Sequence, residues 1–398
     1  MPNDSTHLKN EFYLNPEITF LNHGSYGACP ISVLNENHKW QKVMERDPVR
    51  FMHDEIYVQL DYSRSELAKY VHCDKNSIVY FPNPTHAVSA VIDNIVIDKN
   101  DEILSTNLEY GSCDRMWFDH AKKNKYKYIK SNIDLPIINK KTFLNNFWDY
   151  ASKNTKYIFI SHITSGTGML LPIEEIIKES KRLGILTIID GAHTPGQIPL
   201  NISKLDPDFY IGACHKWLCS PKGASFLYVK KELQDDMEPH IKSWGWGSEY
   251  SEFKDTTQHK TKSRFQNIYQ WQGTRDMSSF LSVPKAIQFQ KEYRWSEVVS
   301  RCNELLINTR NEITNLTGIP KLCPDDFIVQ MSTIIFPFIG HIELKKLLFN
   351  QFQIEIPTYY KDGITAFRIS LQGYNDKNDT DILVDALKTI LNNNKNGI

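Results

Sequence analysis

Apolar positions along the chain recur with two different periods, and the two alternate. Over residues 32–71 they return at helical spacing with charged residues between them, and Asp47-Pro48 interrupts the pattern, so two amphipathic helices are expected. Short apolar runs of strand length then alternate with helical stretches as far as Val229. This order predicts an α/β fold with a mostly parallel sheet and right-handed crossovers. The first runs predicted as strands cover residues 78–81, 101–107, 156–163 and the run that ends at Asp190.

The last third of the chain shows a different pattern. Helical spacing returns at Val283 and continues to about Ile313, which predicts one long helix leading into a smaller domain. Strand patterns follow within residues 328–338, 352–360 and 366–375. We therefore expect three units: an N-terminal segment with a substrate-side loop over residues 1–30, a large domain over 31–284 and a small α+β C-terminal domain over 285–398.

The composition excludes several kinds of partner. Hydrophobic residues make up 41% of the 398 positions, charged residues 23%, and the net charge is -1, so no nucleic-acid surface is expected. The N-terminus lacks a signal-peptide pattern and no apolar run is long enough to cross a membrane, which favours a cytoplasmic protein with no membrane partner. The seven cysteines form no CxxC pair and no metal spacing, so reduced thiols and no metal site are expected.

The stretch over residues 185–229 contains the residues with the clearest chemistry. One apolar run ends in Asp190, a turn of small residues holds His193, and a second apolar run ends in His215-Lys216. Ligands bind outside the carboxyl ends of parallel strands, so these side chains are expected to converge. A lysine there can form a Schiff base with an aldehyde, and a buried aspartate can hold a proton on a pyridine nitrogen. The pattern favours pyridoxal phosphate as cofactor, the alternative being a turn-capping aspartate and a surface lysine.

The motif DGAH, followed 26 residues after its Asp by the Lys of HKW, resembles the cofactor site of the class V aminotransferases, within fold type I of the pyridoxal-phosphate-dependent transferases. The resemblance implies a large domain whose sheet is of the seven-stranded type. It also implies that Lys216 carries the internal aldimine and later acts as base for the Cα proton, and that Asp190 pairs with the pyridine nitrogen. His193 then lies near the phenolic oxygen of the cofactor, and His215 contacts its phosphate or ring.

Three further stretches resemble the family around the cofactor. The helix start in PNPTHAV offers backbone N–H groups to a phosphate, which the resemblance assigns to Thr85, His86 and Ala87, although a threonine is also a common helix cap. Tyr110, which follows the Glu of LEYGS, stands where family members stack a residue on the pyridine ring, with a place in the core as the alternative. Thr164 and Ser165 stand where many members place an Asn against the phenolic oxygen.

A fourth stretch bears on assembly. Gly273-Thr274 resembles the Gly-Thr pair with which class V enzymes reach the phosphate of the neighbouring subunit. The resemblance therefore implies a homodimer with shared active sites, in which Thr274 serves the partner's cofactor.

Two stretches bear on the substrate. The loop FLNHGSYGACP has the small residues of a backbone that something approaches closely, and it resembles the substrate-side loop of isopenicillin N epimerase-like members. Asn22, His23 and Tyr26 are pocket candidates, with a purely structural role as the alternative for His23. An arginine on a strand facing a cleft is a planar partner for a carboxylate, and Arg368 in FRIS matches the family's arginine for the substrate α-carboxylate.

The resemblance is closest to the branch that holds isopenicillin N epimerase and C–S lyases such as hercynylcysteine sulfoxide lyase. Cysteine desulfurases carry a nucleophilic Cys shortly before the carboxylate arginine, and no Cys follows Cys323 here, which disfavours persulfide chemistry. The implied reaction is Cα deprotonation of an external aldimine of an amino acid, followed by β-elimination or epimerisation. Epimerisation needs a second acid, for which His23, Tyr26 and Tyr110 are candidates. A class V aminotransferase and a non-catalytic pyridoxal-phosphate-binding regulatory or assembly protein remain alternatives.

Overall fold

The computed structural model describes residues 8–247, 250–253, 263–361 and 363–395. The first seven residues, which form part of the N-terminus read above, lie outside this range. Among the described residues, no helix is both long and apolar enough to cross a membrane.

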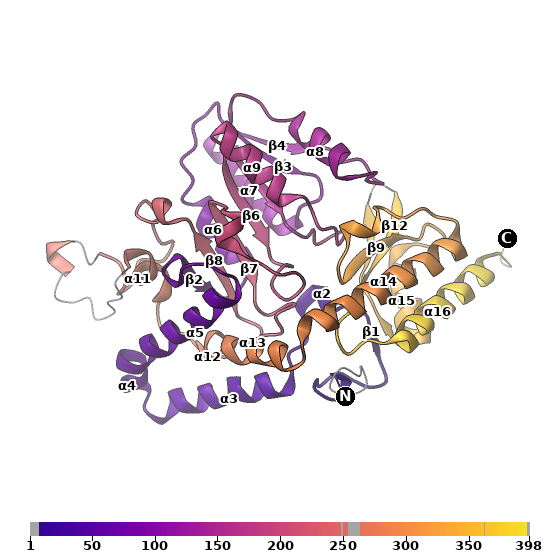
Figure 1. Ribbon diagram of the computed structural model, residues 1–398, viewed down its shortest axis with the longest axis horizontal. Coiled ribbons are helices and arrows are strands. Elements are labelled where there is room, and N and C mark those ends of the chain that lie inside the picture. The colour runs from indigo at the N-terminus through magenta and orange to yellow at the C-terminus, as the bar shows by residue number, and fades with distance from the viewer. Residues whose placement is uncertain (1–7, 248–249, 254–262, 362, 396–398) are drawn as a thin grey trace.

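The central element is a seven-stranded sheet with the strand order β2-β8-β7-β6-β5-β3-β4 (Figure 1). Neighbours from β7 to β4 pair in parallel, whereas β8 runs antiparallel to both β7 and β2. The predicted mostly parallel sheet is therefore confirmed, and β4 forms one of its edges. The strands are β2 (Ile78–Phe81), β3 (Glu102–Thr106), β4 (Lys127–Ser131), β5 (Thr155–Ser161), β6 (Leu186–Gly191), β7 (Phe209–Ala213) and β8 (Ser225–Val229).

Helices bury both faces of this sheet because successive strand residues point to opposite sides. In β6, Ile188 belongs to the core that packs against α6 and α7, whereas Ile189 belongs to the core on the other face, against α5, α9 and α13. Both side chains are fully buried. The helices are α5 (Ile56–Tyr70), α6 (Pro84–Ile92), α7 (Gly111–Asn124), α8 (Lys140–Trp148), α9 (Ile173–Leu183) and α13 (Val283–Glu292), with the short α10 (Ile202–Leu205), α11 (Arg264–Gln270) and α12 (Ser278–Leu281) between them.

The two predicted N-terminal helices are present as α3 (Ile31–Arg46) and α5, joined by the short α4 (Pro48–Arg50) and a π-helical turn over Phe51–Glu55. The break falls at Asp47 as predicted, and the Asp47 side chain accepts a hydrogen bond from the backbone N–H of Arg50. The single long helix expected from Val283 is wrong. The chain forms α13 and then α14 (Trp295–Thr317), because Arg294 adopts a left-handed conformation with φ 48° that ends the first helix.

The C-terminal part forms its own small sheet at the side of the large one (Figure 1). Its antiparallel strands are β9 (Met331–Ile335), β11 (Thr358–Lys361) and β12 (Ile364–Ser370), in the order β11-β12-β9. The strands pack against α14 and α15 (His341–Phe352), and α16 (Lys377–Lys395) packs against these two helices. The N-terminal β1 (Thr19–Phe20) pairs in parallel with β10 (Ile354–Glu355), so the first segment is joined to this part. The predicted domain boundary at residue 284 falls within α13.

Candidate active site

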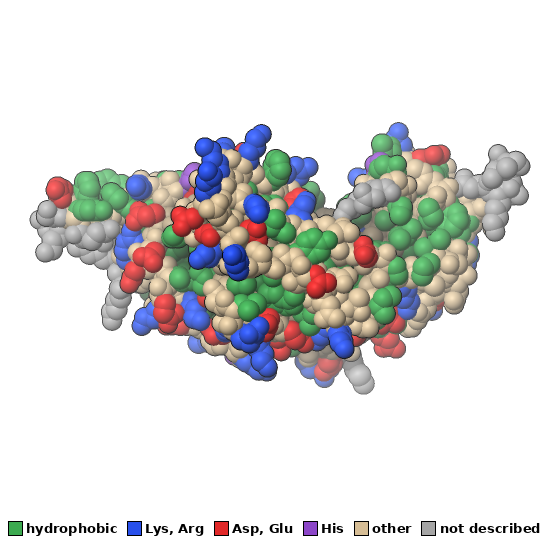
Figure 2. Space-filling model, turned by 90° about the horizontal axis from the view of Figure 1, so that it is seen from above, with side chains coloured by type: hydrophobic (Ala, Val, Ile, Leu, Met, Phe, Trp, Pro, Cys, Tyr) green, Lys and Arg blue, Asp and Glu red, His purple; other side chains and the backbone are tan. Residues whose placement is uncertain are grey.

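A cleft of about 500 Å³ lies where the carboxyl ends of the parallel strands face the small sheet. Figure 2 shows the surface hollowed between the lobe with the seven-stranded sheet and the lobe with the small sheet. Parallel strands end at one edge of a sheet, and Ser161 of β5 is the register partner of Asp190 of β6. The cleft brings together nine of the predicted site residues, namely Tyr26, Thr85, Tyr110, Ser165, Asp190, His193, His215, Lys216 and Arg368.

Lys216 follows β7 by three residues and directs its amine into this cleft. Its Nζ lies 3.0 Å from Nε2 of His193. Burial lowers the pKa of the Lys216 amine to about 8, the Asp190 carboxylate opposes this shift, and the Arg368 guanidinium adds to it. The amine is therefore easier to deprotonate than an exposed lysine and is suited to attack an aldehyde.

Asp190 is buried at the end of β6, with 4% of its surface exposed. Its Oδ1 accepts a hydrogen bond of 2.9 Å from the backbone N–H of Ala192, and its Oδ2 faces the Cys113 thiol at 3.9 Å. Burial raises the pKa of Asp190, and the Ala192 bond and the Lys216 charge oppose that shift. Because the thiol is only a weak donor, Oδ2 of Asp190 can accept a hydrogen bond from a protonated ring nitrogen.

His215 presents a single ring nitrogen to the cleft. Its Nδ1 donates to the backbone carbonyl of Ala224 at 3.0 Å, which leaves Nε2 for a ligand. Burial lowers the pKa of His215 to about 4, and the charges of Lys216 and Lys222 contribute. Thr85 lies nearby in the cleft wall on the first turn of α6, where its backbone N–H has no helical partner, whereas the N–H of His86 donates to Oδ1 of Asn83 at 3.0 Å.

Arg368 extends from β12 into the opposite wall and is 2% exposed. Its guanidinium donates to the carbonyl of Ser165 and, over 3.1 Å, to Oγ of Ser25. Its Nε has no hydrogen-bond partner among the described residues. The Tyr359 ring lies 6.0 Å from the guanidinium carbon. A buried guanidinium with N–H groups to spare fits a carboxylate ligand.

The residues that line the cleft but were not predicted include Ser25, Tyr359 and Glu109. Glu109 accepts hydrogen bonds from the Thr106 hydroxyl and from both the hydroxyl and the backbone N–H of Ser161, at 2.6 to 2.9 Å. Burial raises the pKa of Glu109 to about 8, against the effect of these donors. Its place before Tyr110 was visible in the sequence, but an acidic residue in a turn gives no sign that its carboxyl will be half-buried against Ser161 of β5.

Six predicted residues do not line the cleft. His23 differs most from expectation, because it is fully buried and both ring nitrogens are engaged. Its Nε2 donates to the backbone carbonyl of Lys216 at 3.1 Å, and its Nδ1 accepts from the Tyr374 hydroxyl at 2.9 Å. Burial lowers the pKa of His23 to about 3. The structural alternative for His23 is the one that fits its surroundings.

The other five point elsewhere for local reasons. Asn22 bonds to Glu355, and Thr164 bonds within its own turn to Thr167 and to the N–H of Met169. His86 is exposed on α6, whereas Ala87 is buried in the core beneath it. Thr274 is exposed and lies outside the cleft of its own chain.

The small-residue loop is closely approached, as predicted, and the group that approaches it is the backbone of the lysine segment. Gly27 has φ +70°, and a Cβ added there would lie 2.3 Å from the carbonyl oxygen of His215. The loop therefore packs directly on His215-Lys216.

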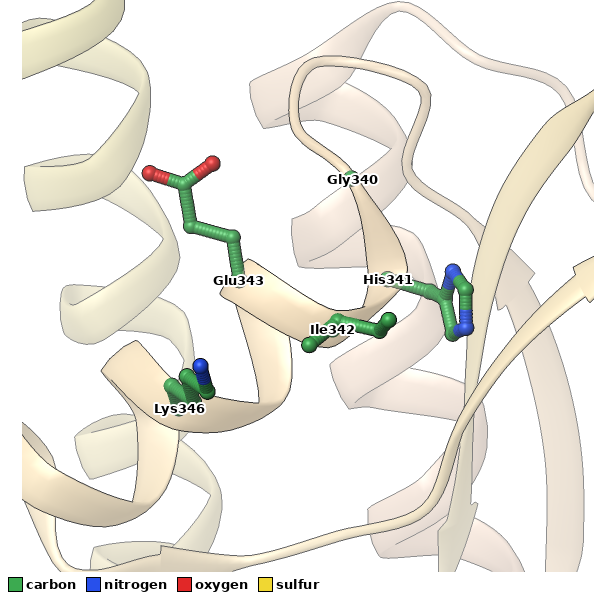
Figure 3. A pocket seen from close by; sticks show the side chains of 5 residues that line it. All are labelled: Gly340, His341, Ile342, Glu343 and Lys346. Carbon is green, nitrogen blue, oxygen red and sulfur yellow. The ribbon is translucent and has the colours of Figure 1, made fainter.

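Another hollow, at the start of α15, is lined by Gly340, His341, Ile342, Glu343 and Lys346, and its polar side chains do not converge (Figure 3). Glu343 points away from His341, which stacks on Tyr360 with ring centroids 5.5 Å apart. Within the described ranges, no group of three or more His, Cys, Asp or Glu residues could hold a metal ion. The reactive side chains are thus those of the cleft between the two sheets.

Comparison with known proteins decides the family. Residues 29–383 match the family described as Aminotransferase class-V. The chain belongs to this family. It is 27% identical to isopenicillin N epimerase of Streptomyces clavuligerus, over 97% of this chain and 98% of the relative. It is also 27% identical to hercynylcysteine sulfoxide lyase of Schizosaccharomyces pombe, over 96% of each. Its fold is that of the cysteine desulfurase of Thermococcus onnurineus NA1, with a TM-score of 0.83, 17% identity and 97% of each chain covered.

The cofactor of this class V family member is pyridoxal 5'-phosphate, and the chain is an enzyme dependent on it. The donor set of the cleft fits the cofactor group by group. The Lys216 amine suits its aldehyde, the Asp190 carboxylate suits its pyridine nitrogen, and Nε2 of His215 with the first turn of α6 suits its phosphate. The indole and imidazole groups around Lys216 add no competing charge.

Proposed function

We propose that this class V enzyme is a C–S lyase that removes a sulfur group from Cβ of a cysteine-type L-amino acid. The overall change is RS–CH₂–CH(NH₃⁺)–COO⁻ plus water giving RSH, pyruvate and ammonium. The hercynylcysteine sulfoxide lyase relative supports this choice. So does the burial of His23, which is the observation that carries the proposal, because it leaves only Tyr26 and Tyr110 of the three candidates for a second acid in the cleft. Epimerisation requires a second acid, and His23, one of its candidates, is fully buried and hydrogen-bonded to Tyr374 and the Lys216 backbone.

Each cleft residue receives a role under this proposal. When bound, pyridoxal phosphate supplies an electron sink that acidifies the Cα proton of the attached amino acid. Lys216 would hold the aldehyde carbon of the cofactor and would serve as the base for the Cα proton, for which a pKa of about 8 is well matched. Asp190 would keep the pyridine nitrogen protonated, and His193 would lie near the phenolic oxygen.

The remaining roles concern position. Thr85 and His215, which line the cleft, would hold the phosphate, and Tyr110 would lie against the ring. Arg368 binds the α-carboxylate of the substrate, with Ser25 fixing one of its N–H groups at 3.1 Å. Among the described residues that line the cleft, the only Lys, Arg, Asp or Glu side chains are Lys216, Arg368, Asp190 and Glu109, and burial raises the pKa of Glu109 to about 8, so a neutral substrate side chain fits the cleft.

We also propose that the active enzyme is a homodimer in the cytoplasm. Thr274 is exposed outside the cleft of its own chain, a position open to a second copy. Tyr26, at the cleft wall, is 75% exposed, which is unusual for a large aromatic side chain. All seven cysteines are free thiols, in keeping with a reducing compartment.

An epimerase is the second candidate, favoured by the Streptomyces clavuligerus relative and by the Tyr26 hydroxyl in the cleft wall. The test is incubation of the enzyme in D₂O with L-cysteine, S-alkyl-L-cysteines and their sulfoxides. The lyase proposal expects equal amounts of pyruvate and ammonium with release of the thiol or sulfenic acid. Deuterium at Cα with inverted configuration and no pyruvate would replace it by the epimerase. Turnover only with an added 2-oxo acid would indicate an aminotransferase, and no turnover of any substrate would leave a cofactor-binding protein.

A further inference from the structure

His193 makes a hydrogen bond with each of its ring nitrogens. Nε2 lies 3.0 Å from Nζ of Lys216, and Nδ1 lies 3.2 Å from Nε1 of Trp217. The His193 imidazole thus connects Lys216 to Trp217, the residue that follows Lys216 in the chain. His193 is 2% exposed and Trp217 is fully buried.

The chemistry of the indole settles which nitrogen of His193 carries the proton. An indole N–H only donates, so Nδ1 of His193 must accept and cannot be protonated. Burial lowers the pKa of His193 well below its usual value, and the positive charge of Lys216 in its protonated form, followed by that of Arg368, adds to this effect. The ring is neutral, and its single proton is on Nε2.

The direction of the second bond follows from the first. Nε2–H of His193 points at Nζ of Lys216, and a donor facing an ammonium N–H would be unfavourable. The bond forms only when the amine offers its lone pair, that is, when Lys216 is unprotonated. Burial and the Arg368 charge favour the same state of Lys216, whereas Asp190 and Cys113 oppose it.

The surroundings hold the indole in this orientation. The backbone carbonyl of Trp217 accepts a bond of 2.8 Å from Nε2 of Gln290, and that of His193 accepts one of 2.7 Å from Nε2 of Gln197. The His23 ring packs against the indole with centroids 4.9 Å apart. Neither side chain can turn away without breaking buried contacts.

We propose that Trp217 is a positioning residue that fixes the tautomer of His193 and thereby keeps the Lys216 amine in its free-base form. The assignment is the same whether the enzyme eliminates or epimerises, because both reactions need this amine. It also explains why an indole follows the lysine: a phenyl ring would fill much of the same space but leave Nδ1 without a donor.

The test compares Trp217→Phe with Trp117→Phe as matched control. Trp117 is also fully buried, and its indole N–H has no partner among the described residues, so the control removes the same group where it serves no bond. The full chain is freed of cofactor, and the rate at which it takes up pyridoxal phosphate covalently is followed by absorbance from pH 6 to 10. The wild type and the control should show a midpoint near the Lys216 pKa of about 8.

For Trp217→Phe, loss of one neutral hydrogen bond should move this midpoint up by about 0.7 pH units and slow uptake at neutral pH about fivefold, with an unchanged rate at high pH. A midpoint that stays in place, or an equal loss of rate at every pH, would overturn the proposal, because a merely structural role has those signatures.

A second measurement decides the matter on the unmodified chain should the variant fail to fold. Solid-state NMR of the chain labelled with ¹⁵N-histidine reports which ring nitrogen is protonated, and the His193 signals are those missing in His193→Gln. Protonation of Nε2 alone at neutral pH is expected. A His193 protonated on Nδ1 would refute the proposal.

Discussion

Replacing Arg368 by glutamine removes the guanidinium to which the substrate carboxylate is assigned. The arginine is 2% exposed and is held by Ser165 and Ser25, so its charge is already desolvated and oriented before a ligand arrives. Burial lowers the pKa of Arg368, and the Tyr359 side chain opposes that shift. The free energy needed to desolvate and orient the guanidinium is thus spent when the protein folds. A carboxylate that binds does not have to supply it again.

The size of the effect follows from that burial. Removing one partner of a buried, hydrogen-bonded charge pair costs about 2 to 5 kcal/mol. At about 1.4 kcal/mol for each factor of ten, affinity for the carboxylate should fall about 30-fold to about 4,000-fold. Arg368→Lys keeps the charge but loses the planar fork, and should lie between the wild type and the glutamine variant.

The assay uses two ligands that differ only in the carboxylate. L-Alanine and ethylamine are titrated into each protein while the absorption band of the bound cofactor is followed. The wild type should bind L-alanine far more tightly than ethylamine, and in Arg368→Gln this ratio should approach one with cofactor affinity unchanged. A variant that retains the wild-type ratio would refute the role of Arg368.

Two further predictions concern the base of the cleft. Gly27→Ala puts a Cβ 2.3 Å from the His215 carbonyl oxygen at a residue with φ +70°. Urea unfolding should therefore show that the free energy of unfolding falls by about 3 kcal/mol. The control is Gly340→Ala, where the added Cβ meets open space and the loss should be less than about 1 kcal/mol. Equal losses would mean that the loop does not press on the lysine segment. The pKa of Glu109 is about 8 in the folded protein, so this carboxyl stays protonated between about pH 4.5 and 8, whereas it ionises in the unfolded chain. The free energy of unfolding should therefore fall as the pH rises through this window, by up to about 1.4 kcal/mol per pH unit. Glu109→Gln should lack that fall, and parallel stability curves for the two proteins would show that the carboxyl is ionised.

The fold was predictable where local pattern and topology agree. Short apolar runs that alternate with helical stretches favour a parallel sheet. The break at Asp47-Pro48 could be predicted because proline disrupts the interior of a helix. The break between α13 and α14 was not, because Tyr293 and Arg294 are ordinary helix residues. The left-handed conformation of Arg294 does not interrupt the helical spacing of the apolar residues, so that spacing could not predict it.

The site divides in the same way. Asp190, His215 and Lys216 could be placed together because they follow neighbouring parallel strands, whose ends must meet. His23 could not be placed, because the partner of its Nδ1 is Tyr374, some 350 residues away, and only the folded chain brings them together. Glu109 was missed for the same reason, since its burial depends on β5 as well as on its own turn.

The central claim is that Lys216 is the residue that holds pyridoxal phosphate. Sodium borohydride reduction of the holoenzyme fixes the cofactor to the amine that carries it, and peptide mass mapping then identifies that amine. The account predicts a pyridoxyl-phosphate adduct on the peptide that contains Lys216, at one per chain, and its loss in Lys216→Ala but not in Lys222→Ala, which alters the exposed lysine six residues further along. An adduct on any other lysine, or none, would contradict the account.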